Sequence, residues 1–343
     1  MNILPLPEQR QEELFELLRL SLGEHQTRKR DRAFWNWKHA QNPFGESISY
    51  VAMEGERLVG LRTFLRWQWC AGNQSYDAIR AVDTATHPQH QRKGIFSRLT
   101  LAVLDEARRE QFDFVFNTPN RKSLPGYLKM GWRLVGQLPL YVKVLAPVRF
   151  AAGLARNALT ACDAEIAVEE IIAGRLVRFG DWLAAHGEEL EGLLTADRLL
   201  RGPGFNTARS VEFLRWRYAG HPYVDYHVLE ARAAGELRGL LICRANARRG
   251  LREVVLADLL LGSADFELVR SMIATLRRQV RADYLIAHFG SGTAQLAGLR
   301  RCGFHRLPRQ GIDLTVRDLD KSVEPDPFSL DDWSLCLGDL EIF

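Results

Sequence analysis

The amino-acid sequence predicts a mixed α+β (mixed α/β) protein made of two tandem units, each with a mixed, mostly antiparallel sheet flanked by helices. Two observations lead to this fold class. The chain has 343 residues, more than a single domain usually contains. One aromatic motif also occurs twice: Trp37 and Pro43 in the first copy correspond to Trp216 and Pro222 in the second, with the same spacing.

The elements around this motif also recur in the same order. Each copy predicts a short aromatic helix that a proline ends. A hairpin follows, with its turn at Gly55 in the first unit and at Gly235 in the second. Further along, a short apolar strand leads into a helix closed by Gly131 or by Gly303, and a glycine suits such a helix end.

These repeats place the boundaries of the predicted units. Residues 1–146 form the first unit, residues 147–160 a connecting helix, and residues 161–316 the second unit. Residues 317–343 form a C-terminal tail that is apolar enough to dock on the body of the protein.

The first unit contains one predicted parallel pair of strands. Residues 60–70 and 76–86 are rich in β-forming residues and predict an antiparallel hairpin. Residues 92–109 have one apolar face and predict an amphipathic helix, and residues 113–117 predict a buried strand. A strand–helix–strand connection of this length implies a parallel pair, whose carboxyl ends are the expected ligand site.

The turn between the second strand and its helix has the features of an anion site. Gly94 permits a close approach of the backbone, and Arg92 and Lys93 add positive charge. The helix N-terminus offers unpaired amides and the positive end of the helix dipole. The alternative is an ordinary turn with solvated basic side chains.

Two motifs in this region resemble the GNAT superfamily of N-acetyltransferases. The superfamily's pyrophosphate loop has Gln or Arg, then Gly three positions later, and then Gly or Ala two positions after that Gly. Gln91 and Gly94 match this pattern, and Phe96 departs from it. The segment that begins at Asn120 resembles a second motif, in which Tyr127 and Gly131 stand at the expected positions.

The resemblance implies acyl transfer from acetyl-CoA as co-substrate. By this resemblance Asn120 contacts the pantetheine arm, and Tyr127 is the general acid that protonates the departing thiolate. Packing within the core is the alternative role for Tyr127. The acyl-CoA contacts expected in this sequence are Thr84, Ala85, Thr86, Gln91, Arg92, Lys93, Gly94, Ile95, Phe96, Ser97, Asn120 and Ser123.

Direct transfer to an amine also needs a proton acceptor. Asp83 is one catalytic candidate, although strand alternation places it on the face opposite Thr84 unless a β-bulge re-aims it. A structural ion pair with Arg80 or Arg98 is the alternative role for Asp83.

The C-terminal tail is a second source of a proton acceptor. Asp339, Glu341 or the terminal carboxylate would serve if the tail docks at the active site. Some tandem-unit acetyltransferases that this chain resembles use a terminal carboxylate in this way. A tail that only packs for stability is the alternative.

The second unit lacks the chemical motifs of the first. No Gln-x-x-Gly precedes its corresponding helix, and residues 262–265 predict a simple N-cap instead. Its last helix has Gly298 or Leu299 where the first unit has Tyr127. We therefore expect a single acyl-CoA site, in the first unit.

Composition limits the other classes of function. The net charge of +4 is too small for a nucleic-acid-binding surface, and the five cysteines are too far apart for a zinc site, so no metal is expected. No apolar run is long enough to span a membrane, which takes about 20 residues, and the sequence predicts a cytoplasmic protein.

The acceptor is expected to be an amine of a small molecule or a saccharide, and a homo-oligomer stays open. Two other functions remain as alternatives. One is an aminoacyl-tRNA-dependent ligase of the kind that builds peptidoglycan bridges, and the other is a non-catalytic CoA-binding module. The length of the acyl chain and the acceptor itself do not follow from the sequence.

Overall fold

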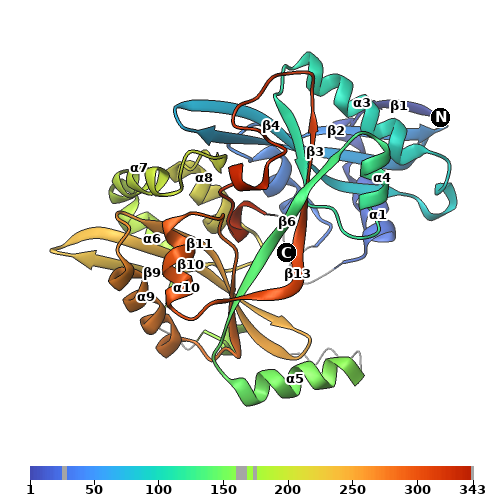
Figure 1. Cartoon of the computed structure of the whole chain (residues 1–343). Coiled ribbons are helices and arrows are strands. Elements are labelled where there is room, and N and C mark those ends of the chain that lie inside the picture. The colour runs from blue at the N-terminus through green and yellow to red at the C-terminus, as the bar shows by residue number, and fades with distance from the viewer. Residues whose placement is uncertain (25–28, 160–167, 173–175, 341–343) are drawn as a thin grey trace.

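The computed structural model describes residues 1–24, 29–159, 168–172 and 176–340. We call residues 1–159 the first half, residues 168–318 the second half and residues 319–340 the C-terminal segment. Figure 1 shows most of the first half above the second, with the helix of residues 147–159 at the bottom and two long strands running between the halves.

The first half contains six strands. They are β1 (Asn2–Pro5), β2 (Ile48–Glu54), β3 (Arg57–Ala71), β4 (Gln74–Thr86), β5 (Phe114–Asn117) and β6 (Arg133–Val144). Its helices are η1 (Glu8–Arg10), α1 (Gln11–Leu22), α2 (Arg32–Trp35), the π-helical turn η2 (Asn36–Ala40), η3 (Pro88–His90), α3 (Ile95–Arg109), α4 (Leu124–Lys129) and α5 (Pro147–Leu159).

The second half repeats much of this order. Its strands are β7 (Val177–Arg178), β8 (Asn206–Thr207), β9 (His227–Ala233), β10 (Glu236–Arg248), β11 (Leu251–Leu261), β12 (Tyr284–Ala287) and β13 (His305–Asp318). Its helices are η4 (Val168–Glu170), α6 (Phe179–His186), η5 (Gly187–Glu189), α7 (Leu190–Leu200), α8 (Val211–Leu214), the π-helical turn η6 (Arg215–Ala219), α9 (Phe266–Gln279) and α10 (Ala294–Arg301). The C-terminal segment adds η7 (Leu330–Asp332) and η8 (Leu337–Asp339).

The fold is mixed α/β with a mostly antiparallel sheet, as the sequence predicts. The parallel pairs are β4 with β5 and β11 with β12. The hairpin of β3 and β4 and the amphipathic helix α3 lie where the sequence places them. Ile95, Leu99 and Val103 form the buried face of α3.

The predicted sheets of the two units are joined into one. The strand order is β1-β2-β3-β4-β5-β13-β6-β12-β11-β10-β9-β7. Strand β13 pairs with β5 of the first half, and β6 pairs with β12 of the second half. Each half therefore contributes its last strand next to the other half, and β6 and β13 run side by side between them (Figure 1).

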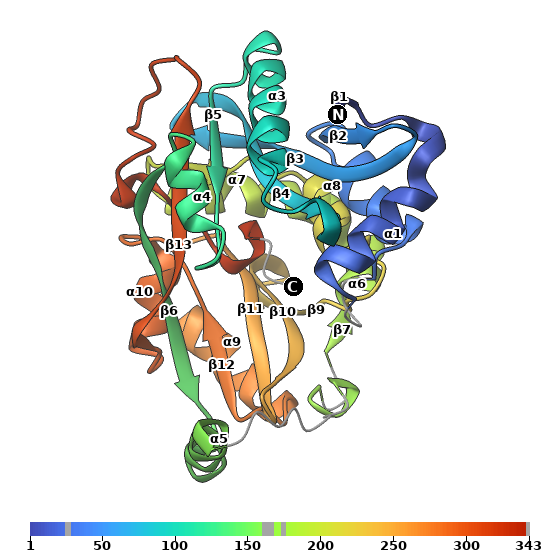
Figure 2. The same ribbon diagram turned by 90° about the vertical axis from the view of Figure 1, so that its right-hand side faces the viewer.

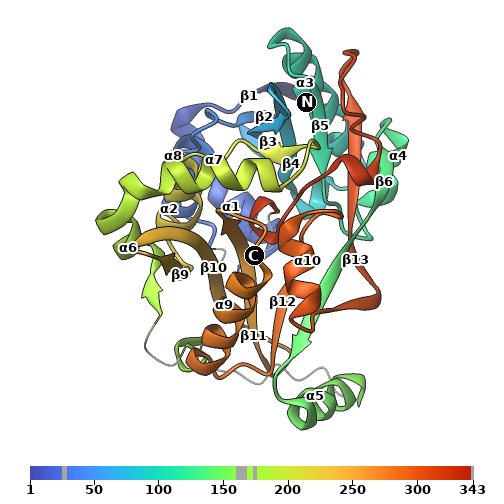
Figure 3. The same cartoon turned by 60° about the vertical axis from the view of Figure 1, so that its left-hand side comes forward.

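Helices cover the sheet on both faces. Side chains of α3 and α4, such as Val103 and Tyr127, pack against Phe64 and Ile79 of the first half. On the other face, α1 packs against β2, β3 and β4, as Figure 2 shows from the side. In the second half, α9 and α10 lie on one face of the strands (Figure 3).

The largest apolar cluster joins the two halves. It contains Trp37, Trp67 and Trp69 from the first half, Trp216 from the second and Trp333 from the C-terminal segment. Trp67 and Trp69 are buried, which agrees with a role in packing. Burial of this much apolar surface fixes the halves relative to one another.

Candidate functional site

Strands β4 and β5 part at the carboxyl end of their parallel pairing. Strand β5 pairs with Ala78–Arg80 of β4, whereas β4 continues to Thr86. Among the residues that the structure describes, no strand pairs with residues 81–86 on this edge. Backbone amides and carbonyls along such an edge can bond an extended ligand. The predicted contacts Thr84, Ala85 and Thr86 lie on this segment.

A β-bulge at Asp83 changes the direction of side chains on β4. Arg62 of β3 pairs with Thr84 and Thr63 pairs with Val82, so Asp83 has no partner of its own in β3. Thr84 contacts the Arg62 guanidinium. Asp83 instead contacts η2, so the bulge directs its carboxylate toward the interface between the halves.

The loop after β4 ends in an uncapped helix N-terminus. Arg92 and Gly94 have left-handed φ angles of 63° and 72°, and α3 begins at Ile95. Gly94 occupies the N-cap position, and no side chain caps the first amides of α3. Those amides and the dipole of a 15-residue helix are groups that can bind an anion, and they lie after the end of β4.

The basic side chains of this loop face solvent. Gln91, Arg92 and Lys93 are exposed, as is Ser97 in the first turn of α3. Lys93 Nζ lies 3.4 Å from His90 Nδ1. Their charge adds to the positive end of the helix dipole.

The packing of Phe96 accounts for the large residue at a position where the superfamily pattern has Gly or Ala. Its ring meets the Tyr127 ring edge to face, with centroids 5.7 Å apart. A side chain at Gly126 would come within 3.3 Å of the Phe96 ring, so the small residue on α4 makes room for the large one on α3. Phe96 therefore links the loop to Tyr127 by packing.

Asn120 and Ser123 shape the turn that leads into α4. Asn120 Oδ1 accepts hydrogen bonds from the amides of Lys122 and Ser123, at 2.9 and 3.0 Å. The Ser123 hydroxyl lies 3.2 Å from the same oxygen. Both side chains thus hold the turn before Tyr127.

Tyr127 lies at the end of this arrangement. Its side chain is buried, and its Oη accepts a hydrogen bond from Arg62 Nη2 at 2.7 Å. The loop, the edge of β4 and α4 thus converge on Tyr127 through Phe96 and Arg62. This convergence brings together the anion site and the predicted general acid.

Asp83 is surrounded by basic side chains. Its carboxylate lies 2.7 Å from Lys38 Nζ, 3.0 Å from His39 Nε2 and 3.4 Å from Arg30 Nη1. Burial alone would raise the pKa of Asp83, but Lys38, the hydrogen bond with His39 and Arg30 outweigh burial and hold this pKa well below its ordinary value. A carboxylate in this setting is a weak proton acceptor. Its partners differ from Arg80 and Arg98, the two that the sequence suggests.

A pocket lies between the halves, on the side of the sheet that Asp83 faces. It is small, with a cavity volume of about 20 Å³, and is walled by Trp37, Trp67 and Trp216. Lys38, Leu65, Arg80, Arg217, Asp339 and Leu340 complete its lining. We call it the interface pocket.

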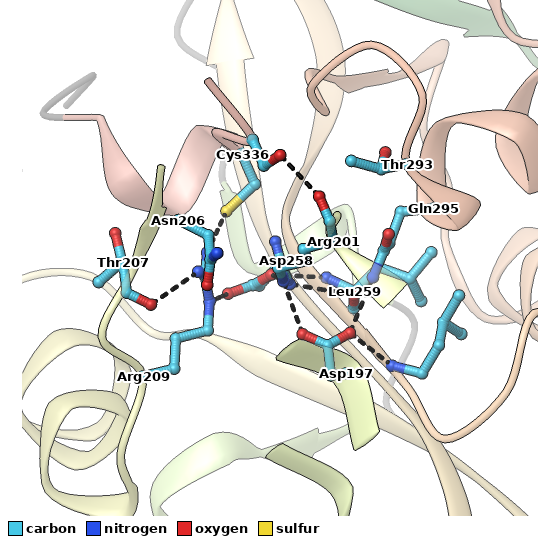
Figure 4. Close-up of polar contacts among 12 residues, drawn as sticks. Asp197, Arg201, Asn206, Thr207, Arg209, Asp258, Leu259, Thr293, Gln295 and Cys336 are labelled. Atoms are coloured by element: carbon cyan, nitrogen blue, oxygen red, sulfur yellow. Dashed lines mark hydrogen bonds and ion pairs between the residues drawn. The ribbon is translucent and has the colours of Figure 1, made fainter. Parts of the chain in front are cut away.

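The C-terminal segment is anchored by a buried ionic network (Figure 4). Arg209 lies between Asp258 and Asp339, and Arg201 lies between Asp258 and Asp197. Asp339 also accepts hydrogen bonds from the Thr207 hydroxyl at 2.7 Å and from the Cys336 amide at 2.8 Å. The carboxylate of Asp339 is therefore engaged in holding the segment, while residues 341–343, including Glu341, lie outside the described residues.

In the described part of the second half, the helix that corresponds to α3 begins differently. Asp265 caps α9 by accepting a hydrogen bond from the Glu267 amide, which confirms the predicted N-cap. Strand β12 pairs with β11 only at Glu253–Val255. The C-terminal segment lies in the opening beyond, where Cys336 bridges to Phe289. Leu299 is fully buried in the apolar core.

Three residues near the site do not follow from the sequence reasoning. Lys38 and His39 hold Asp83, and Arg62 holds Tyr127. The sequence does mark Arg62, because it is a charged residue within an otherwise apolar strand segment. No local pattern marks Lys38 and His39, because their contact with Asp83 joins segments far apart in the chain.

Two searches of the described residues are negative. No group of three or more His, Cys, Asp or Glu side chains in that part of the chain has an arrangement that would hold a metal ion. No described helix combines the length and apolar character needed to cross a membrane.

Comparison with known proteins gives a consistent picture of the fold. Residues 2–135 match the family model of the acetyltransferase (GNAT) domain. No curated protein sequence matches the chain significantly. Among solved structures, a probable N-acyltransferase from Enterococcus faecalis is similar, with a TM-score of 0.63, 13% identity, and coverage of 93% of this chain and 73% of that chain.

Two further structures show the same fold. A GCN5-related N-acetyltransferase from Anabaena variabilis has a TM-score of 0.63 and 14% identity, covering 93% of this chain and 73% of that chain. The N-myristoyltransferase of Saccharomyces cerevisiae with bound myristoyl-CoA has a TM-score of 0.57 and 11% identity, covering 97% and 83%. Residues 2–135 therefore match the GNAT acetyltransferase domain, and solved GNAT N-acetyltransferases share the fold over most of this chain.

Proposed function

We propose that this protein is an acyl-CoA-dependent N-acyltransferase that transfers acetyl directly from acetyl-CoA to an amine of a small molecule or sugar. One observation carries the proposal. The uncapped N-terminus of α3, the unpaired edge of β4 and the hydroxyl of Tyr127 converge at one place. The match to the GNAT acetyltransferase domain supports acyl transfer as the reaction class.

The donor would be held by backbone groups more than by side chains. The amides of Ile95, Phe96 and Ser97 would bind the pyrophosphate, because they are uncapped at the positive end of α3. The edge of β4 from Thr84 to Thr86 would bond the pantetheine arm. Asn120 and Ser123 would complete this side of the donor site from the turn before α4.

The reaction needs two proton transfers. The amine nitrogen attacks the thioester carbonyl, the carbon–sulfur bond breaks, and the electron pair leaves with the thiolate. Tyr127 would donate a proton to that thiolate, and the amine must lose a proton to a base. Asp83 is itself a weak proton acceptor, because its pKa is low. Its proposed role is therefore to orient Lys38 and His39, and another group would accept the proton.

We further propose that the second half is a degenerate copy of the first, with no donor site of its own. The recurrence of Trp37 as Trp216, each within a π-helical turn, supports this relationship. The Asp265 cap and the C-terminal segment in the opening of β11 and β12 support the loss of the donor site. The second copy would then complete the acceptor cleft, next to the interface pocket.

The test is release of CoA thiol by the purified protein from acetyl-CoA in the presence of a panel of amines, including amino sugars. We expect thiol release that depends on one class of amine, with the acetylated amine detected by mass spectrometry. Longer acyl-CoA donors, tested in parallel, define the acyl chain that fits. Donor binding without transfer to any amine in the panel would favour a CoA-binding module instead.

A further inference from the structure

Arg62 is a charged side chain enclosed in the core next to the proposed general acid. Its exposed fraction is 0%, and its guanidinium lies against the rings of Phe64, Phe96 and Tyr127, at 4.5, 5.3 and 5.4 Å from their centroids. It donates hydrogen bonds to the Val82 carbonyl and to the Thr84 hydroxyl. A cation in such a place is rare, because the loss of hydration costs several kcal/mol.

The surroundings of Arg62 do not neutralise its charge. Within the described residues the hydrogen-bond partners of Arg62 are a carbonyl and two hydroxyls, no carboxylate pairs with it, and its Nε has no hydrogen-bond partner. Arg66, four residues further along β3, differs in both respects, because it pairs with Glu110 at 2.6 Å and its Nε donates a hydrogen bond to the Glu46 carbonyl at 2.6 Å. A purely structural role would favour an apolar residue at position 62, since burying an unpaired charge destabilises a fold.

The buried charge of Arg62 lies against the hydroxyl of Tyr127. An arginine has only donors, so Tyr127 Oη must be the acceptor in the 2.7 Å hydrogen bond from Arg62 Nη2. The hydroxyl proton of Tyr127 therefore points away from Arg62. That proton is the one available for transfer to a leaving group.

We infer that Arg62 is the positioning residue of the acid: it orients the Tyr127 hydroxyl and stabilises the phenolate that proton transfer leaves. When the thiolate takes the proton, the O–H bond of Tyr127 breaks and an S–H bond forms. The negative charge then lies on Oη, next to the buried guanidinium. A preorganised cation in a low-dielectric site stabilises such a charge at the moment it develops.

This inference rests on the proposed function, in which Tyr127 is the general acid. The experiment compares Arg62→Met, Arg62→Lys and Tyr127→Phe with the double variant Arg62→Met/Tyr127→Phe. Arg66→Met is the matched control on the same strand. Each variant is assayed for kcat and KM in the acetyl-CoA thiol-release reaction, and its Tm is measured.

We expect Arg62→Met to lower kcat by ~10- to 100-fold, a part of the effect of losing a general acid. The KM for acetyl-CoA should change less than about threefold, because the charge acts mainly in the transition state. In the Tyr127→Phe background, Arg62→Met should change kcat by less than about twofold, since coupled residues are non-additive. Arg62→Lys should recover part of kcat by keeping the charge, and Arg66→Met should match the wild type.

Stability separates this role from packing. Arg62→Met should keep the wild-type Tm or raise it, because it removes an uncompensated buried charge. A lower Tm with normal kcat would overturn the inference. So would additive losses in the double variant, or a KM increase that accounts for the whole defect, because Arg62 would then act independently of Tyr127. Full turnover of Tyr127→Phe alone would remove the acid role itself, and this inference with it.

Discussion

Trp37 and Trp216 stack on each other between the two halves, with ring centroids 5.5 Å apart and planes 19° from parallel. Trp37 Nε1 donates a hydrogen bond to the Trp216 carbonyl at 2.7 Å, and Trp216 Nε1 donates to the Trp37 carbonyl at 2.6 Å. Each residue thus makes the same contact with the other. A reciprocal contact of this kind is what a two-fold arrangement of two similar units produces.

This contact predicts that the halves are stabilised together. Trp37→Ala and Trp216→Ala should each lower the free energy of unfolding by about 3–5 kcal/mol, because each leaves a large cavity. The double variant should lose less than the sum, since each side chain packs on the other. Denaturant unfolding measures these values, and Leu199→Ala, at an 80% exposed position, is the control. Additive losses would contradict the coupling.

A buried histidine predicts how stability depends on pH. Burial lowers the pKa of His288 from 6.5 to about 4, against the opposing effects of the Pro139 carbonyl and Asp339. The folded protein therefore keeps His288 neutral, and its contribution to stability is present above pH 6.5 and is lost as the pH falls toward 4. His288→Gln should remove this part of the pH dependence.

The measurement is urea unfolding of both proteins at about pH 7 and about pH 5. The wild type should lose about 2 kcal/mol more than His288→Gln between these values, which follows from the pKa difference. An equal loss in the two proteins would contradict a neutral His288 in the folded state.

The C-terminal segment predicts two separable effects. Asp339→Ala should destabilise the fold by about 3–5 kcal/mol, because it leaves Arg209 buried without one of its partners. Deletion of residues 341–343 keeps Asp339 and should leave the Tm close to that of the wild type. If the chain end supplies the proton acceptor, this truncation should lose turnover and still bind acetyl-CoA. Full activity of the folded truncation would exclude that role.

Much of the fold follows from local patterns in the sequence. The spacing of Trp37 and Pro43 predicts the repeat, and the alternation along β3 and β4 predicts their hairpin. These signals are local, so one sequence is enough to see them. The exchange of β6 and β13 between the halves has no such signal, because pairing partners distant in sequence leave no local pattern.

The candidate site divides in the same way. Gln91, Gly94 and Tyr127 stand in short motifs and are visible in the sequence. The sequence also indicates Asp83 as a candidate, but its bulge and its partners Lys38 and His39 depend on tertiary contacts. The role of Arg62 depends on the position of α4 over β3, which no pattern in either segment specifies.

Tyr127 predicts a specific kinetic defect. Tyr127→Phe should lower kcat by ~10²–10⁴-fold, since the thiolate loses its proton donor. The KM for acetyl-CoA should change little, because the hydroxyl acts in the transition state. Steady-state thiol release measures both constants. Tyr141→Phe, which removes a hydroxyl from β6, is the control and should match the wild type. A near-normal kcat of Tyr127→Phe would return this residue to a packing role.

The central claim is that one acyl-CoA binds per chain, at the N-terminus of α3, and calorimetric titration with acetyl-CoA tests it most directly. We predict one site for the wild type and none for Gly94→Val, because Gly94 has a φ angle of +72° that a β-branched residue rarely adopts. Gly72→Val, in a turn with a φ angle of +55°, is the matched control and should bind one acetyl-CoA. Two equal sites in the wild type, or unchanged binding by Gly94→Val, would contradict the account.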